Sequence, residues 1–254
     1  DANGNVVGLV RGLNVGDEYL GRDPKFGHWR DTHMRIEGPA ELGAQLSFAE
    51  DWYWASEHWL DLSWIPVPSE DGDIPVLILP TGPADELETA NLMFVHAINS
   101  AQERIWIASP YFVPDRPVIT ALQLAGLRGV DVRILIPDTP DHLATWLAAF
   151  SYFDESASTG VDFYRYQDGF LHQKVMLVDD EVSTVGTANF DNRSFRLNFE
   201  ITALVVDGDF AAEIEHMLEA DFAKSRLMQP GEYDTKPWWF RFAVKLARLT
   251  APIQ

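Results

Sequence analysis

Residues 170–200, FLHQKVMLVDDEVSTVGTANFDNRSFRLNFE, place an imidazole, an ammonium group, amides and carboxylates in one short stretch. His172 and Lys174 are two residues apart, so in an extended strand their side chains point to the same face. A histidine can attack phosphorus as a nucleophile, and a lysine can hold a phosphate oxygen as a compact charge. This pair therefore predicts phosphoryl transfer, with both residues catalytic.

Further polar residues follow the pair and complete the expected site. Asn189, Thr187 and Ser194 offer neutral donors, so we expect them to bind the substrate phosphate. Glu200 is expected to be catalytic by accepting the second ring N–H of His172 and fixing its tautomer. The segment shows neither a glycine-rich phosphate loop nor an acidic metal cluster, so we expect no metal and no cofactor.

A weak internal repeat relates the beginning of the chain to this segment. The stretch Gly12-Leu-Asn14 resembles Gly186-Thr-Ala-Asn189, so Asn14 is also expected to bind phosphate. The spacing from His172 to Asn189, counted back from Asn14, passes the first residue of the chain. The sequence therefore lacks the His and Lys of the first copy, which is expected to be the tail of a unit whose second copy is complete.

The composition narrows the class of partner. The chain has 254 residues, 46% of them hydrophobic, and a net charge of −20, which argues against nucleic acid as the main partner. It contains no cysteine, no signal peptide and no apolar run of the roughly 18 residues that a membrane span needs. Because it begins with Asp1, we expect a fragment of a longer protein.

The apolar periodicity predicts alternating strands and helices from Ile74 onward, which favours an α/β fold with a mixed sheet between helices. Three regions are expected: the remainder of a first lobe at 1–70, a complete second lobe at 74–228, and a C-terminal helix at 236–254. Within the second lobe, the expected strands are 76–79, 104–109, 130–136, 161–166, 174–178, 181–185 and 201–206. The expected helices are 86–100, 118–127, 143–153 and 210–225.

The C-terminal segment 236–254 holds basic and aromatic residues and no acidic one. Arg241, Lys245 and Arg248 fall on one face of the expected helix, and apolar residues fall on an adjacent face. This pattern predicts either an interfacial helix on anionic lipid or a helix packed on its own domain.

The pattern His172-x-Lys174-x4-Asp179-x6-Gly186-x2-Asn189 resembles the HKD motif of the phospholipase D superfamily. The flanking stretches GLNVGDEYLG (12–21), WRDT (29–32), SPYFVPD (109–115) and NFDNRSFRLNFE (189–200) are similar to bacterial cardiolipin synthases. The resemblance covers essentially the whole chain. It implies a phospholipase D-like fold of two pseudo-repeated lobes, of which the first is truncated here.

The resemblance also implies the reaction. Two HKD motifs face each other, one His attacks the phosphorus of phosphatidylglycerol, and a phosphohistidine forms. The other His protonates the departing glycerol and then activates a second phosphatidylglycerol, so that cardiolipin and glycerol result. The first-motif His is often the nucleophile, which would make His172 the acid/base, but the sequence does not assign the two roles. Asp179 of the motif is expected to be catalytic, with a structural role as the alternative.

Several alternatives remain open at this stage. A hydrolytic phospholipase D or an HKD nuclease would use the same motif, and a degenerate membrane-bound scaffold would have lost the first one. Asp31 resembles Glu200 in place, so it is expected either to orient the missing His or to be a plain surface carboxylate. The expected partners are phosphatidylglycerol and a membrane surface, and the expected location is the bacterial inner membrane.

Overall fold

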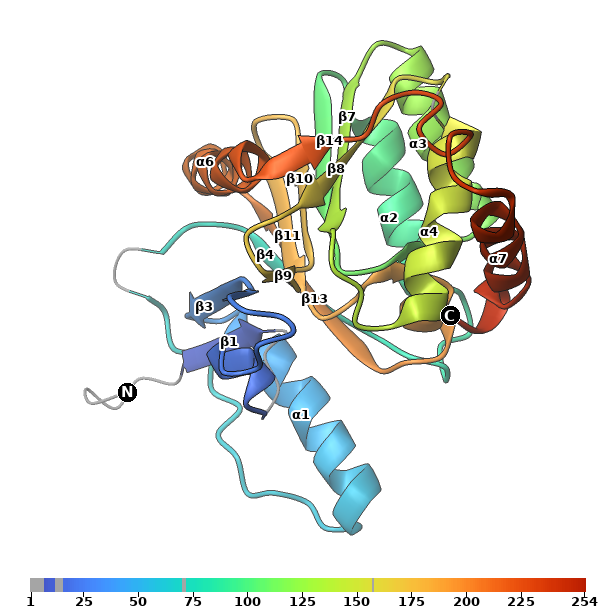
Figure 1. The fold of residues 1–254 in the computed structure, drawn as a ribbon. Coiled ribbons are helices and arrows are strands. Elements are labelled where there is room, and N and C mark those ends of the chain that lie inside the picture. The colour runs from blue at the N-terminus through green and yellow to red at the C-terminus, as the bar shows by residue number, and fades with distance from the viewer. Residues whose placement is uncertain (1–6, 12–15, 70–71, 157) are drawn as a thin grey trace.

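A computed structural model describes residues 7–11, 16–69, 72–156 and 158–254. Its centre is an eight-stranded mixed sheet in the order β14-β8-β7-β5-β10-β11-β13-β4 (Figure 1). The strands are β4 (Val76–Thr81), β5 (Arg104–Ala108), β7 (Asp131–Pro137), β8 (Val161–Tyr166), β10 (Val175–Val178), β11 (Val182–Gly186), β13 (Glu200–Val206) and β14 (Ser225–Leu227).

The middle of the sheet is buried on both faces, which explains why its strands read as apolar runs. Strands β5, β7 and β8 are parallel, and β10 runs antiparallel to β5, with Ile107 beside both Ile134 and Met176. Strand β10, with the sequence VMLV, has no exposed residue. The segment that carries His172 and Lys174 leads directly into this buried strand.

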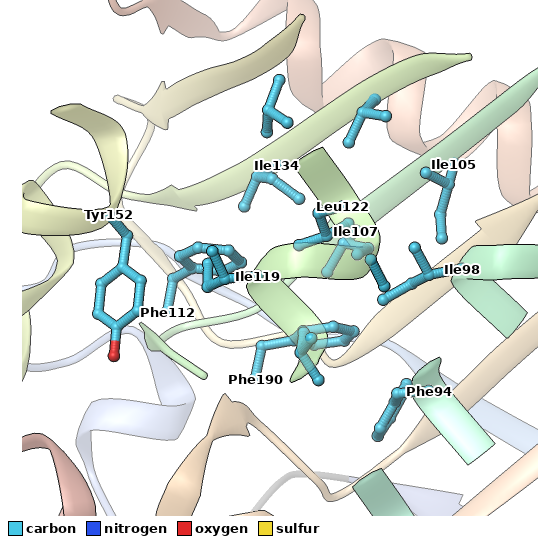
Figure 2. Packing of buried hydrophobic residues seen from close by; sticks show 14 of the residues in the cluster. Phe94, Ile98, Ile105, Ile107, Phe112, Ile119, Leu122, Ile134, Tyr152 and Phe190 are labelled. Carbon is cyan, nitrogen blue, oxygen red and sulfur yellow. The ribbon is translucent and has the colours of Figure 1, made fainter. Parts of the chain in front are cut away.

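Helices cover both faces of the sheet, as Figure 1 shows. Helices α2 (Thr89–Ser100), α3 (Arg116–Leu127) and α4 (Leu143–Ser156) share one core with the sheet. Figure 2 shows that core, in which isoleucines of β5 and β7 meet side chains of α2 and α3. Helix α6 (Gly208–Ala223) packs on the other face, together with β1 (Val7–Arg11) and β3 (His33–Glu37). The α/β class and the mixed sheet flanked by helices are therefore as expected.

Three helices begin at an aspartate whose carboxylate accepts an N–H of the first turn. Asp115 caps α3, Asp191 caps α5 (Asn192–Arg196), and Asp207 caps α6. Such caps typically contribute about 0.5–2 kcal/mol. The cap of α5 matters for the site, because its acceptor bond of 2.7 Å fixes the backbone of Ser194.

The beginning of the chain repeats the pattern of its second half. Strand β1 pairs antiparallel with β3, which α1 (Glu41–Ser56) follows, just as β11 pairs with β13 before α6. Two short parallel pairs then join distant segments. They are β2 (Trp29–Arg30) with β9 (Phe170–Leu171), and β6 (Phe112–Val113) with β12 (Phe190–Asp191).

The expected elements of the second lobe are all present, with bounds that differ by a few residues. The helix expected over 210–225 was wrong at its end, because it stops at Ala223 and Ser225–Leu227 forms β14 on β8. Sequence periodicity also missed the two-residue strands. In the part of the chain that the structure describes, no helix combines the length and the apolar character that a membrane crossing requires.

Candidate active site

His172 and Lys174 lie on the segment between β9 and β10, and their side chains meet. The lysine Nζ is 2.9 Å from Nδ1 and 3.0 Å from Nε2 of the imidazole. It also donates a hydrogen bond of 2.5 Å to the carbonyl oxygen of His172. The ammonium therefore lies directly beside the ring, where one phosphate group can contact both side chains.

The carboxylate that holds His172 is Asp31, from the beginning of the chain. Its Oδ2 is 3.0 Å from Nδ1 of the imidazole. The parallel pairing of β2 with β9 sets Arg30 beside Leu171, so the next residues, Asp31 and His172, are neighbours. The expectation that Glu200 accepts this ring N–H was wrong, because Asp31, which lies just before β3, contacts the ring instead.

A buried polar network holds the segments that carry Asp31 and His172. Gln173 is fully buried between His172 and Lys174, and its amide donates to Asp221 over 2.8 Å. Its Oε1 accepts a bond of 2.6 Å from the hydroxyl of Thr32. The carboxylate of Asp221 also receives Nε of Arg30 at 2.9 Å. Arg30, next to Asp31, and Gln173, next to His172, are thus hydrogen-bonded to the same carboxylate of Asp221.

Aromatic rings enclose one side of the imidazole. The ring of Trp29 lies 4.9 Å from that of His172, and the ring of Tyr19 lies 6.1 Å away. This wall limits the access of water and favours the neutral imidazole. Sequence reasoning missed both contacts, although the stretch WRDT that contains Trp29 was part of the family resemblance.

Glu200 lies in the same cleft, at the start of β13, but has partners of its own. It accepts hydrogen bonds from Thr187 at 2.5 Å, Ser194 at 2.9 Å and Asn198 at 3.1 Å. The hydroxyl protons of Thr187 and Ser194 are therefore used on this carboxylate. In this structure both hydroxyls position Glu200, and their expected contact with phosphate stays a prediction.

The side chain of Asn189 retains hydrogen-bonding capacity in the cleft. It lines the cleft, and its Oδ1 is buried without a hydrogen-bond partner among the described residues. Its expected contact with phosphate stays a prediction. The corresponding prediction for Asn14 falls outside the described residues.

Asp179 lies at the far end of β10, in the turn to β11, one strand length away from Lys174. Its carboxylate accepts the backbone N–H groups of Gln102, Glu103 and Arg104 over 2.9–3.2 Å. Its own backbone has a φ of 51°, which an aspartate tolerates better than most residues. Asp179 thus joins this turn to the start of β5, as its structural alternative expects, and its catalytic role stays a prediction.

The proton states of the pair follow from burial and charge. Burial lowers the pKa of His172, and the adjacent ammonium acts in the same direction, while the bond to Asp31 opposes both. Burial also lowers the pKa of Lys174 to about 8, against the pull of Asp31 and Glu200. Burial opposes ionisation of Asp31, but its bond to His172 and the charge of Lys174 prevail and lower its pKa. At neutral pH, the site holds a neutral imidazole beside a charged ammonium.

Glu200 differs from Asp31 in its electrostatics. Burial raises the pKa of Glu200, although three hydrogen bonds act against this effect. No cation pairs with its carboxylate in the parts of the chain that the structure covers. Its carboxylate is held by neutral donors, and among the described residues it contacts no imidazole as Asp31 does.

The open cleft is lined by residues of both halves of the chain. We call the buried or half-buried lining residues His172, Lys174, Asn189 and Glu200 its base. We call its exposed carboxylates and large apolar side chains its walls and mouth, namely Glu50, Asp51, Asp85, Trp54, Leu197 and Phe199. Around a phosphate bound at the base, the carboxylates could accept hydrogen bonds from substrate hydroxyls, and the apolar side chains could contact hydrocarbon. This arrangement can hold a phosphodiester and let an imidazole attack it or exchange a proton with it.

Solved structures define the class of fold. Nuc from Salmonella typhimurium, a phospholipase D family member, superposes with a TM-score of 0.53 at 22% identity, over 62% of this chain and 99% of that one. A phosphatidylserine synthase from Haemophilus influenzae superposes with a TM-score of 0.71 at 17% identity, over 98% of this chain and 69% of that one. The fold is therefore phospholipase D-like.

The sequence comparison defines the family within this class. A family model described as "Cardiolipin synthase, PLD-like domain" matches residues 94–222, about half of the chain, and the chain belongs to this family. It is 51% identical over 248 residues to cardiolipin synthase A of Pseudomonas fluorescens strain Pf-5, covering 98% of this chain and 52% of that protein. It is 51% identical over 246 residues to the enzyme of Pseudomonas aeruginosa strain LESB58. The chain spans about half the length of the curated relatives that it matches.

Proposed function

We propose that this chain supplies one catalytic half of a cardiolipin synthase, which transfers a phosphatidyl group between two phosphatidylglycerol molecules. The observation that carries the proposal is the contact of His172 with Lys174 and Asp31 at the base of an open cleft. It is supported by the match to the cardiolipin synthase family and by half-length similarity to its curated members.

The geometry suggests what each group does. Asp31 accepts the Nδ1 proton of His172, so the lone pair that attack or proton transfer requires is on Nε2, which lies 3.0 Å from the ammonium of Lys174. Lys174 holds a phosphate oxygen and offsets the negative charge that develops on it. Burial keeps the imidazole neutral at the pH of catalysis, as both a nucleophile and a general base require.

The transfer takes two steps. One imidazole forms an N–P bond as the P–O bond to glycerol breaks, and a second histidine gives glycerol its proton. The second histidine then takes a proton from a hydroxyl of the other phosphatidylglycerol, whose oxygen displaces the imidazole. The products are cardiolipin and glycerol. The neutral ring of His172 suits attack in the first step and proton uptake in the second, whereas the acid role in the first step would require the ring to be protonated beforehand.

We infer that β1, β3 and α1 are the end of a first lobe, because they repeat the order of β11, β13 and α6. The first lobe lends Asp31 to the histidine of the second lobe. By the same exchange, Glu200 is positioned for a histidine of the first lobe, which the sequence of 254 residues does not contain. The second His–Lys pair then comes from a segment outside this sequence, or, as the less favoured arrangement, from another copy of the chain.

The cleft favours a lipid over a nucleic acid as substrate. Its wall carries Glu50, Asp51 and Asp85, which would repel a polyanion but can accept hydrogen bonds from glycerol hydroxyls. Its mouth exposes Trp54 and Phe199, whose side chains suit acyl chains. Together with the net charge of −20, these features argue against the nuclease alternative.

The test uses a polypeptide that spans the full length of the relatives, supplied with phosphatidylglycerol in mixed micelles. Mass spectrometry should detect cardiolipin, and His172→Ala should reduce its formation on the order of 10²-fold or more. His216→Ala, at an exposed position on α6, serves as the control and should leave the rate unchanged. Phosphatidic acid as the main product would instead establish a hydrolase, and an unchanged rate in His172→Ala would refute the catalytic role.

A further inference from the structure

The inner face of α7 (Trp238–Leu249) packs on its own domain. Val244 is fully buried, and the ring of Phe240 lies 5.1 Å from that of Phe150 on α4. Arg248 lies 3.5 Å over the ring of Tyr152 and pairs with Glu155. One of the two expectations for this helix, packing on the domain, is therefore met by this face, and α7 lies beside α4 (Figure 1).

The outer face of α7 carries a continuous apolar stripe that is largely exposed in the described structure. Its members follow the spacing of one helical face, and each is at least half exposed. They are Trp239 at 58%, Phe242 at 56%, Leu246 at 50% and Leu249 at 76%, with Trp238 at 74% and Ile253 at 67% at the two ends. Isolated exposed apolar residues are ordinary, but an aligned set of this size marks an interaction surface.

The charge around this stripe has the opposite sign to that of the molecule. The segment 236–254 contains basic residues and no acidic one, although the chain carries a net charge of −20. Lys236 and Arg248 are paired with Glu232 and Glu155. Arg241 and Lys245 form no ion pair within the described residues, and they lie on the same helix as the apolar stripe.

We propose that the outer face of α7 docks the protein onto an anionic lipid bilayer, with the helix lying in the plane of the interface. An apolar stripe flanked by free cations and preceded by two tryptophans is the pattern that such helices show. Elsewhere the negative surface of this chain would be repelled by anionic lipid, so docking is confined to this helix. The proposal rests on the proposed function in one respect, because a lipid-transferring cleft needs access to a membrane.

The first lobe is an unsuitable occupant of this face. Strands β1 and β3 pack on the same side of the central sheet as α6, whereas α4 and α7 belong to the opposite layer. A continuation of the first lobe from β1 therefore starts on the other side of the molecule. A second copy of the chain is left as an outcome of the test.

The end of α7 is joined to the mouth of the cleft. The 3-10 turn η2 (Ala251–Ile253) follows α7, and the carbonyl oxygen of Ala251 accepts the side-chain amide of Asn192 at 2.9 Å. The carbonyl oxygen of Gln254 accepts the backbone N–H of Arg193 at 2.7 Å. Helix α5 then leads to Leu197 and Phe199, the exposed apolar residues at the mouth. Docking through α7 would thus hold this mouth in a fixed relation to the bilayer.

The test is cosedimentation of this chain with vesicles of phosphatidylcholine mixed with phosphatidylglycerol. Phe242→Glu combined with Leu246→Glu should reduce the partition coefficient roughly tenfold or more, because both side chains leave the interface. The matched control is Leu124→Glu combined with Leu127→Glu on α3, whose residues are 47% and 68% exposed. The control should bind as the wild type does.

The charge component has its own control. Arg241→Gln combined with Lys245→Gln should weaken binding to the mixed vesicles, most strongly at low salt, and Lys25→Gln should not. Binding to pure phosphatidylcholine vesicles should be weaker than to the mixed ones. Equal binding to both kinds of vesicle, or wild-type binding by Phe242→Glu with Leu246→Glu, would overturn the proposal.

Two further measurements separate this proposal from its alternatives. His172→Ala should cosediment unchanged, and loss of binding in this variant would assign the contact to the cleft instead of α7. A dimer in vesicle-free solution that Phe242→Glu with Leu246→Glu dissociates would assign the face to a second copy. None of these measurements needs turnover, so a failure of the proposed reaction would leave the result on α7 standing.

Discussion

At the scale of single residues, two neighbours of opposite charge act on the pKa of His172. Asp31 raises the pKa of the imidazole, and Lys174 lowers it. Asp31→Asn should therefore lower the pKa of His172, and Lys174→Met should raise it. Both shifts can be followed by ¹⁵N NMR titration of the imidazole, assigned through the signal lost in His172→Gln.

Glu200→Gln is the control for this measurement, because Glu200 bonds to Thr187, Ser194 and Asn198 and not to the imidazole. We expect it to move the pKa of His172 less than Asp31→Asn does. A larger shift in Glu200→Gln would contradict the assignment of Asp31 as the partner of His172.

The buried ammonium of Lys174 is expected to bind phosphate, but its burial destabilises the folded protein. Its pKa falls from 10.5 to about 8 on folding, so the unfolded chain binds more protons between these values. This group therefore destabilises the protein fully below pH 8, and stability is regained as the pH rises toward 10.5. Lys174→Met should raise the free energy of unfolding at neutral pH, by up to about 3 kcal/mol, while phosphate affinity falls.

Urea denaturation at neutral and at alkaline pH measures this effect, and it should be smaller at alkaline pH. Lys224→Met is the control, since that lysine is half exposed and pairs with Asp168 at the surface. A Lys174→Met variant less stable than Lys224→Met would show that the burial of the ammonium is already compensated by its partners.

At the scale of elements, substitution of Asp179 can show whether this motif residue stabilises the β10–β11 turn or takes part in the reaction. Burial opposes its ionisation, but backbone N–H groups from the start of β5 prevail and lower its pKa. It therefore stabilises the fold above the unfolded pKa, and this contribution is lost as the pH falls through the folded value. Asp179→Ala should lower the free energy of unfolding by about 1–3 kcal/mol at neutral pH.

Phosphate affinity, measured by calorimetry, should be the same in Asp179→Ala as in the wild type. Asp162→Ala, an exposed position on β8, should change neither quantity. Unchanged stability with lost phosphate affinity would support the catalytic role that the motif suggested.

Most elements could be predicted because their signals are local. The runs around β7 and β10 are apolar enough to mark buried strands, and α6 shows its cap and its period in the sequence. The pairing of β2 with β9 could not be found in this way. Each of these strands has two residues and lies about 140 positions from the other in the chain, so only tertiary packing brings them together.

At the scale of the whole molecule, the tertiary pairing of β2 with β9 explains which site residues could be predicted from the sequence and which partner could not. His172, Lys174, Asn189 and Glu200 were expected in one site because they lie within one segment, and they do line one cleft. The partner of His172 was assigned to the wrong copy of the repeat. Spacing within a copy shows which residues correspond, but it does not show that the carboxylate beside His172 comes from the other copy.

The proposed exchange of carboxylates between the two lobes leads to a prediction for Glu200 in a full-length polypeptide. In the present chain, burial raises its pKa, and no imidazole bonds to it among the described residues. A first-lobe histidine placed as His172 is to Asp31 would lower that pKa through a hydrogen bond and its charge. The carboxyl resonance of Glu200, assigned through Glu200→Gln, should therefore titrate at lower pH in a full-length polypeptide than in this chain. In that polypeptide, Glu200→Gln and Asp31→Asn should each slow cardiolipin formation, on the order of 10²-fold. An identical titration of Glu200 in the two polypeptides would show that the first-lobe histidine is held by another group.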